Sequence, residues 1–161
     1  MLPRERNERM TVETTRFGVV EIDDNSQVQM TSGLLGFEDH ARYCLIDHSP
    51  EANFRWLQSM EDPGLAFVVV NPYDYFADYT IEISDADAAK LGLTKEEDAI
   101  VMTIVTLDKD ASRITANLAA PIVVNSKNLR AAQVVLQDER YPIRHPLFGT
   151  SVAEPVVAKA A

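Results

Sequence analysis

The segment Ile100-Val101-Met102-Thr103-Ile104-Val105-Thr106-Leu107 decides the fold class of this chain. It is long and most of its residues are β-branched, a composition that favours strands over helices. It therefore predicts a central strand of a sheet. Upstream, the run Ala66-Phe67-Val68-Val69-Val70 is continuously apolar, which predicts a strand buried on both faces.

Shorter segments of strand length lie on both sides of these two runs. Residues 11–22 and 27–30 are expected to form a hairpin around Asp23-Asp24-Asn25-Ser26, whose side chains favour a turn. Further strands are expected at residues 42–47, 54–59, 79–83, 113–118, 122–125 and 131–136. Nine to eleven short strands at this spacing are typical of an all-β sandwich or barrel. We expect a single β domain over residues 11–148, with flexible residues 1–10 and 149–161 at its ends.

One short helix is predicted at residues 84–91, inserted between strands. Ser84 is a favourable N-cap residue, and Asp85 and Asp87 suit the positive end of the helix dipole. Gly92 suits the left-handed position that ends many helices. Thr94 is expected to cap a further turn over residues 95–97.

Composition limits the classes of function that the chain can have. Its 161 residues carry a net charge of −10, which argues against a nucleic-acid surface and is compatible with a basic protein partner. Residues 71–100 alone hold eight acids and two bases. No apolar run approaches the roughly 20 residues that span a bilayer, and the N-terminus has no signal-peptide pattern. With Cys44 as the single cysteine, these features predict a cytoplasmic protein without a disulfide.

No motif for nucleotide binding, metal binding or nucleophilic catalysis is present, so we expect neither a cofactor nor a catalytic residue. His40 and His48 follow Asp39 and Asp47, and a hydrolase or metal enzyme using these histidines is the weaker alternative. Solvated loop positions are the favoured interpretation for both histidines. A small-ligand-binding β-barrel is a second alternative, and it predicts an apolar pocket with a few polar groups.

Several segments, in this order along the chain, resemble the flagellar assembly factor family FliW. They are Gly33-Leu34-Leu35-Gly36-Phe37, Phe54-Arg55-Trp56-Leu57-Gln58-Ser59, residues 66–73, residues 78–83, residues 115–125, and residues 133–136 leading to Tyr141-Pro142-Ile143-Arg144-His145-Pro146-Leu147. Leu35 departs from the pattern, because the family usually has proline there. The resemblance implies a compact β-barrel-like domain with about ten short strands and one inserted helix.

The resemblance also implies two protein partners, with no bond made or broken. One is CsrA, an RNA-binding translational repressor, which FliW-like proteins sequester. The other is flagellin, which occupies the FliW-like protein when it accumulates and so frees CsrA. Binding to nucleic acid or to a membrane is not implied.

Two acidic segments are predicted to contact a basic partner. The first is an aromatic connector, which contributes Asp74, Phe76, Asp78 and Tyr79, because aromatic residues beside acids suit a binding surface. The second contributes Glu96, Glu97 and Asp98. Residues 117–125 and 141–145 match the family's motifs, and we interpret them as mainly structural.

Overall fold

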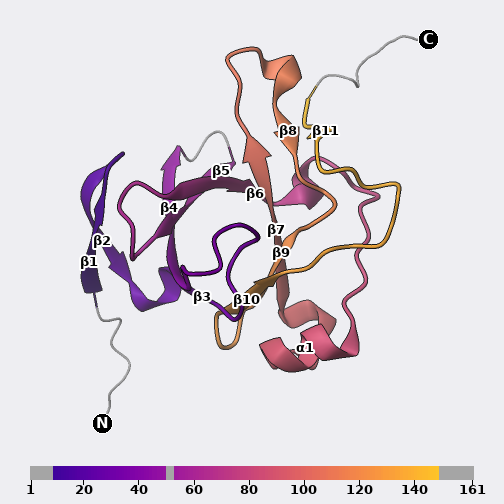
Figure 1. Cartoon of the computed structure of the whole chain (residues 1–161), viewed down its shortest axis with the longest axis horizontal. Helices are drawn as coiled ribbons and strands as arrows, with labels where there is room; N and C mark the ends of the chain where they lie inside the picture. The colour runs from indigo at the N-terminus through magenta and orange to yellow at the C-terminus, as the bar shows by residue number, and fades with distance from the viewer. Residues whose placement is uncertain (1–8, 50–52, 149–161) are drawn as a thin grey trace.

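The structure is a computed structural model that describes residues 9–49 and 53–148. In this part of the chain it contains strands β1 to β11, one α-helix and four short 3-10 helices (Figure 1). The strands are β1 (Arg9–Thr14), β2 (Gly18–Asp23), β3 (Gln27–Met30), β4 (Arg42–Ser49), β5 (Phe54–Ser59), β6 (Ala66–Val70), β7 (Ala99–Thr106), β8 (Thr115–Ala116), β9 (Ile122–Asn125), β10 (Arg130–Gln133) and β11 (His145–Pro146). The helices are η1 (Asp24–Ser26), η3 (Pro72–Asp74), α1 (Asp85–Leu91), η4 (Glu96–Asp98) and η5 (Ala111–Arg113).

Seven strands close into a barrel, which confirms the predicted mostly-β, barrel-like fold. The hydrogen-bonded order β7-β6-β5-β4-β3-β10-β9 is completed by a second pairing of β7 with β9. β10 pairs with β3 in parallel, and the other pairs in the ring are antiparallel. β8 and β11 extend the sheet beyond the ring from the C-terminal end of β7 (Figure 1).

The central strand predicted at residues 100–107 is confirmed as β7, which pairs with three other strands. Its first half, at Ala99 to Met102, pairs with β9, and its second half pairs with β6 and β8. The length of the β-branched run is what allows one strand to serve both parts of the sheet. The barrel closes through this strand.

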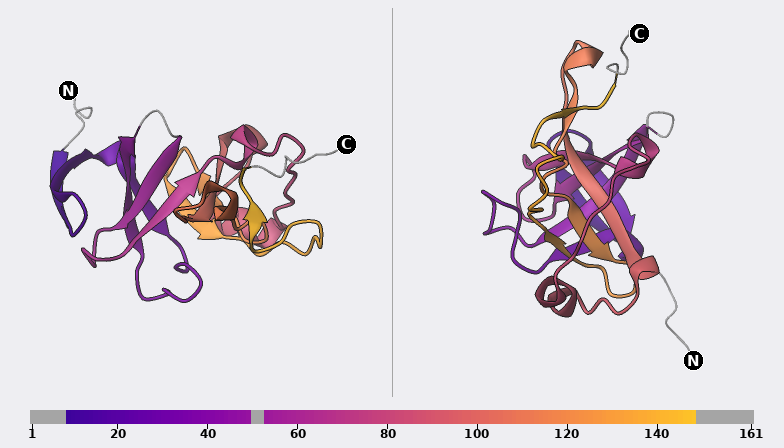
Figure 2. Two further views of the ribbon diagram at one scale, coloured as in Figure 1. Left: turned by 90° about the horizontal axis from the view of Figure 1, so that it is seen from above. Right: turned by 90° about the vertical axis from the view of Figure 1, so that its right-hand side faces the viewer.

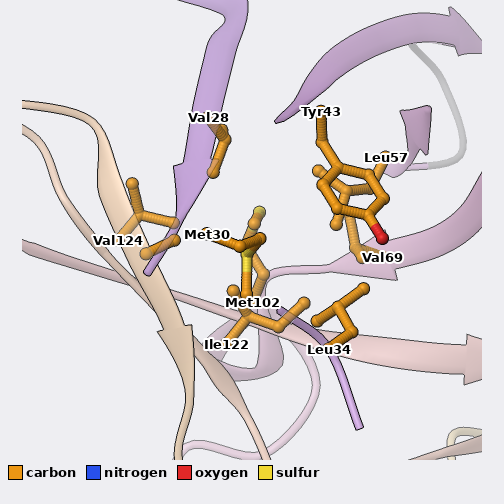
Figure 3. Close-up of a cluster of buried hydrophobic side chains, with 10 residues drawn as sticks. Val28, Met30, Leu34, Tyr43, Leu57, Val69, Met102, Ile122 and Val124 are labelled. Carbon is orange, nitrogen blue, oxygen red and sulfur yellow. The ribbon is translucent and has the colours of Figure 1, made fainter. Parts of the chain in front are cut away.

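The interior of the barrel is filled with side chains from all seven strands. Figure 3 shows that they point toward one another across the ring, together with Leu34 from the loop after β3. The buried members are Val28, Met30, Leu34, Tyr43, Leu57, Val69, Met102, Ile122, Val124 and Ala131. Burial on this scale supplies the main stabilisation of the fold, at roughly 1.5–3 kcal/mol for each large apolar side chain.

A second apolar layer covers the outer face of the barrel. The connector, residues 71–84, and the C-terminal arm, residues 134–148, pack against β6, β7 and β8, while α1 packs against β9 and β10 (Figure 2). Successive strand residues face opposite sides, so Val105 contributes to this outer layer and Ile104 to the interior. Leu91 anchors α1, being fully buried beside Val123.

The N-terminal hairpin differs from the predicted one. β1 and β2 pair with each other in full register, from Arg9↔Asp23 to Thr14↔Gly18, and β3 belongs to the barrel instead. The turn between them is closed by the Thr14 hydroxyl, which donates to the Gly18 carbonyl at 2.8 Å and accepts from the Phe17 N–H at 2.8 Å. A single strand over residues 11–22 was therefore wrong, since Thr14 and Gly18 provide a turn inside it.

Residues 79–83 were predicted as a strand but form no ladder with any described strand. The segment is held by side chains: the Tyr79 hydroxyl donates to the Leu118 carbonyl at 2.7 Å, and the Thr80 N–H donates to the Tyr141 hydroxyl at 3.0 Å. The strand predictions over residues 113–118 and 131–136 were too long. Only β8 and Arg130–Gln133 are strands there, although the Val134 and Leu136 N–H groups still bond to carbonyls of Pro121 and Ala119.

The predicted helix is confirmed with its caps. The Ser84 hydroxyl accepts from the Asp87 N–H at 3.0 Å, and Gly92 ends the helix with a φ of 71°. Thr94 does not cap the following turn, because Lys95 takes the N-cap position of η4. Arg9 and Met10 lie in β1 rather than in a flexible arm, whereas residues 1–8 and 149–161 of the predicted arm and tail fall outside the described residues.

Candidate functional site

A groove of about 870 Å³ opens on the outer face of the barrel, between the connector, α1 and the first half of β7. We call it the outer groove. It is lined by Tyr73, Tyr79, Thr80, Ile81, Glu82, Ile83, Asp85, Ala88, Leu93, Thr94, Lys95, Glu96, Ala99 and Val101. The connector crosses this side of the barrel on its way to α1 (Figure 2).

The connector is fixed at its start by a short capped turn. The Asn71 side chain accepts a hydrogen bond from the Tyr73 N–H at 2.9 Å, and Pro72 occupies the first position of η3. This turn leads the chain away from β6 and leaves Tyr73 43% exposed at the groove. Burial raises the pKa of Tyr73, which favours the neutral form of its hydroxyl.

Tyr79 holds the middle of the connector to the arm. Besides its bond to the Leu118 carbonyl, its ring meets Tyr141 edge to face, with 4.7 Å between centroids, and lies 5.8 Å from Tyr73. The side chain is only 4% exposed, and burial raises its pKa. Tyr79 therefore supports the groove from below rather than presenting its ring to solvent, which corrects its predicted surface position.

The opposite wall is built from α1 and the turn after it. The Asn125 and Asn128 side-chain amides both donate to the Leu91 carbonyl, at 2.8 and 3.0 Å, so the C-terminal end of the helix is tied to the end of β9 and the turn after it.

The chain before β9 is also held by a side chain. Asn117 accepts from the Ala119 and Ala120 N–H groups at 3.1 Å. These contacts agree with a structural role for residues 117–125.

The groove and its rim are acidic. Glu82, Asp85 and Glu96 line it, against the one lining base Lys95. Of the predicted site residues, only Tyr79 and Glu96 line the groove. Asp74, Asp78 and Glu97 are exposed, Asp98 is half-buried, and Phe76 packs edge to face on His145 at 4.9 Å. The role of all seven residues in binding, Tyr79 included, stays a prediction.

Glu82 and Asp85 were missed as candidates, together with the apolar lining residues Ile81, Ile83 and Val101. The alternation Ile81-Glu82-Ile83 was attributed to a strand of the sheet, and Asp85 to the helix dipole. One sequence signal could have pointed to Glu82. The polar residue of this alternation is an acid, and the alternation lies between Asp78 and Ser84. Sequence alone does not place the segment beside β7.

The histidines do not assemble a reactive centre within the described residues. His40 is half-buried, and its Nδ1 is buried without a hydrogen-bond partner there, so it is not the solvated side chain that was expected. His48 lies in β4 rather than in a loop. In residues 9–49 and 53–148, no three His, Cys, Asp or Glu side chains are grouped so that they could hold a metal ion. No helix in this part of the chain is long and apolar enough to cross a membrane.

A closed seven-stranded barrel with a packed interior and a grooved outer face defines a class of small single-barrel β proteins. A model of the FliW protein family matches residues 11–147. The chain is 40% identical over 139 residues to a flagellar assembly factor FliW of Syntrophus aciditrophicus, covering 86% of this chain and 88% of that one. It is also 40% identical over 152 residues to the flagellar assembly factor FliW of Bdellovibrio bacteriovorus, covering 94% and 86%.

A crystal structure of a flagellar assembly factor FliW superimposes with a TM-score of 0.80 at 33% identity, over 87% of this chain and 98% of the other. The chain belongs to the FliW family of flagellar assembly factors.

Proposed function

We propose that this protein binds the RNA-binding repressor CsrA and flagellin in the cytoplasm, so that flagellin synthesis follows flagellar assembly. In this scheme the protein sequesters CsrA and releases translation of flagellin. Flagellin that has not been exported then occupies the protein and frees CsrA. No bond is made or broken, so the protein acts as a binding partner and not as an enzyme.

The observation that carries the proposal is the acidic outer groove on a member of this family. Glu82, Asp85 and Glu96 lie in the groove, and Asp74 and Asp78 are exposed on the connector that forms one wall. Opposite charge on two partners accelerates their association and disfavours partners of like charge. A basic RNA-binding protein is the type of partner that such a surface suits.

The regulatory scheme needs the two partners to exclude each other. For flagellin to displace CsrA, the coupling free energy between the two binding events must be of order 1–3 kcal/mol or more. That coupling must also be reciprocal, so CsrA weakens flagellin binding by the same factor. A shared or overlapping surface would provide it without a conformational change.

The test is a three-component experiment with purified full-length protein, CsrA, flagellin and the leader RNA of a flagellin message. We expect the protein to remove CsrA from the RNA in a mobility-shift assay, and added flagellin to restore the CsrA–RNA complex. RNA binding by CsrA that is undiminished at saturating protein would contradict the proposal. A protein that antagonises CsrA equally well with and without excess flagellin would contradict its second half.

A further inference from the structure

We propose that the outer groove binds a partner segment in the extended conformation, whose backbone pairs with exposed backbone of this protein and whose side chains alternate between basic and apolar. The identity of the partner rests on the proposed function, whereas this mode of binding does not. The proposal depends on unpaired backbone groups on two sides of the groove, and on the charge of its lining.

The connector supplies the first unpaired backbone. Within residues 9–49 and 53–148, no hydrogen bond reaches the N–H or C=O groups of Ile81, Glu82 and Ile83. The segment is nevertheless held at both ends, by the Thr80 N–H bond to Tyr141 and by the Ser84 cap of α1. A short segment outside the helices and strands, with fixed ends and free backbone groups, can serve as a template for one more strand.

β7 supplies the second unpaired backbone, at Val101. The C=O groups of Ile104 and Asp98 accept from the N–H groups of Asn117 and Ser126, so the even-numbered residues of this region direct their backbone toward β8 and β9. Because bonding directions alternate along an antiparallel strand, Val101 directs its N–H and C=O toward the opposite edge, where β6 lies.

β6 ends before it reaches Val101. Its last pair is Val70↔Thr103, and continuing that register would put Pro72, which has no N–H, opposite Val101. In the part of the chain that the structure describes, no residue outside the strands bonds to either backbone group of Val101, and the pairing of β7 with β6 has already ended at Val70↔Thr103. Val101 also lines the outer groove. The position opposite Val101, which β6 does not reach, therefore lies beside the outer groove.

The side chains around the groove specify the chemistry of the occupant. Ile81 and Ile83 are half-buried, while Glu82 between them is exposed, so the segment has one apolar and one acidic side. Glu82, Asp85 and Glu96 outnumber Lys95 in the lining. An added strand that alternates Lys or Arg with Val, Ile or Leu would match both sides at once.

Unpaired backbone groups favour an extended occupant over a helical one. A helix satisfies its own backbone internally and would gain nothing from the free groups of Glu82 and Val101. An extended segment exchanges main-chain bonds with the groove and gains its specificity from alternate side chains.

A phage-displayed library of 12-residue peptides, selected on the full-length protein, tests this mode of binding without any assumed partner. We expect enriched sequences in which basic and apolar residues alternate, and a synthetic consensus peptide that binds at least about tenfold more weakly to the variant Glu82→Lys/Glu96→Lys. Neither replaced side chain has a hydrogen-bond partner among the described residues. The matched control Glu13→Lys/Asp39→Lys has the same net charge as the groove variant, but it alters exposed acids outside the groove. It should bind the peptide with an affinity within about twofold of that of the unchanged protein.

Backbone pairing is tested with the same peptide carrying N-methyl groups on alternate amides. N-methylation on the bonding side should weaken binding by about tenfold or more, because it removes the donors while preserving charge and side chains. The proposal is overturned if no such peptide is enriched, if the groove variant and the control variant bind the peptide equally, or if neither set of N-methylated amides weakens binding.

Hydrogen exchange tests whether the proposed partners bind in the outer groove. The amides of Ile81, Glu82, Ile83 and Val101 should exchange quickly in the free protein and at least about tenfold more slowly in a complex with CsrA or flagellin. If a partner binds and these amides stay unprotected, the inference fails and the proposed function stands. If neither partner binds but the peptide does, the proposed function fails and the inference stands.

Discussion

Of the described glycines, Gly33 is the one at which an added Cβ would meet the closest contact. Its φ is 77°, and a Cβ added there would lie 2.5 Å from the Glu38 Cα, closer than non-bonded carbons approach. We expect Gly33→Ala to lower the free energy of unfolding by at least about 2 kcal/mol, because positive-φ strain of about 1–2 kcal/mol adds to the clash. Urea denaturation measures this change.

Gly36 provides the matched comparison. Its φ is 86°, but an added Cβ would meet nothing within 4 Å. Gly36→Ala should therefore cost only the conformational strain, about 1–2 kcal/mol. Equal losses for the two variants would contradict the role given to the Glu38 backbone.

Leu35 makes a hydrogen bond that a proline at this position could not donate. Its N–H donates to the Gln133 side-chain oxygen at 2.9 Å, while the Gln133 amide nitrogen donates to the Ala120 carbonyl at 3.0 Å. Gln133 thus joins the turn after β3 to the start of β9.

Cys44 is fully buried, and burial raises the pKa of its thiol from 9.0 to about 11. The folded protein therefore holds this proton more tightly than the unfolded chain does. The resulting stability is complete below pH 9.0 and is lost as the pH rises toward about 11. Tyr43, whose pKa rises to about 12, adds a loss of the same sign above pH 10.0.

Urea denaturation at a series of alkaline pH values measures this effect. We expect stability to fall as the pH rises above 9.0, and to fall less steeply in the variant Cys44→Ala, which lacks the thiol. Identical slopes for the two proteins would contradict a contribution from Cys44.

At the scale of elements, the connector depends on Tyr79 for its position. Tyr79→Phe keeps the ring but leaves the buried Leu118 carbonyl without this donor, so we expect a loss of about 1–3 kcal/mol in unfolding free energy. Tyr73→Phe is the control, because that ring is 43% exposed. Its effect should stay within about 0.5 kcal/mol. Equal effects of the two changes would argue against the buried hydrogen bond.

Elements with local signals could be predicted from the sequence, and elements that depend on distant partners could not. Ser84 and Gly92 specify both ends of α1 within a few residues, and the structure has the helix there. Residues 79–83 have the composition of a strand, but a strand needs a neighbour, and none of the described strands pairs with this segment. The positions of distant elements also decide which acids line the groove: Glu82 does and Asp78 does not.

At the scale of the whole molecule, the packed barrel interior stabilises every element around it. Ile122 is fully buried at the point where β9 meets β7. Ile122→Ala should lower the unfolding free energy by about 2–5 kcal/mol, since it removes apolar contacts and leaves a cavity. Ile143→Ala, at a side chain 66% exposed, should change it by no more than about 0.5 kcal/mol in the same denaturation experiment. A small effect at Ile122 would mean that the barrel collapses to fill the space.

The parallel pairing of β3 with β10 joins an early and a late part of the chain, at Arg130↔Gln29 and Ala131↔Met30. A ribosome releases the N-terminal strands first, so β3 emerges with no partner on that edge and β7 with none on the edge that β9 later occupies. Both edges remain in water until β9 and β10 have left the exit tunnel. That interval of translation is when the nascent polypeptide most needs shielding from its neighbours on the same polysome.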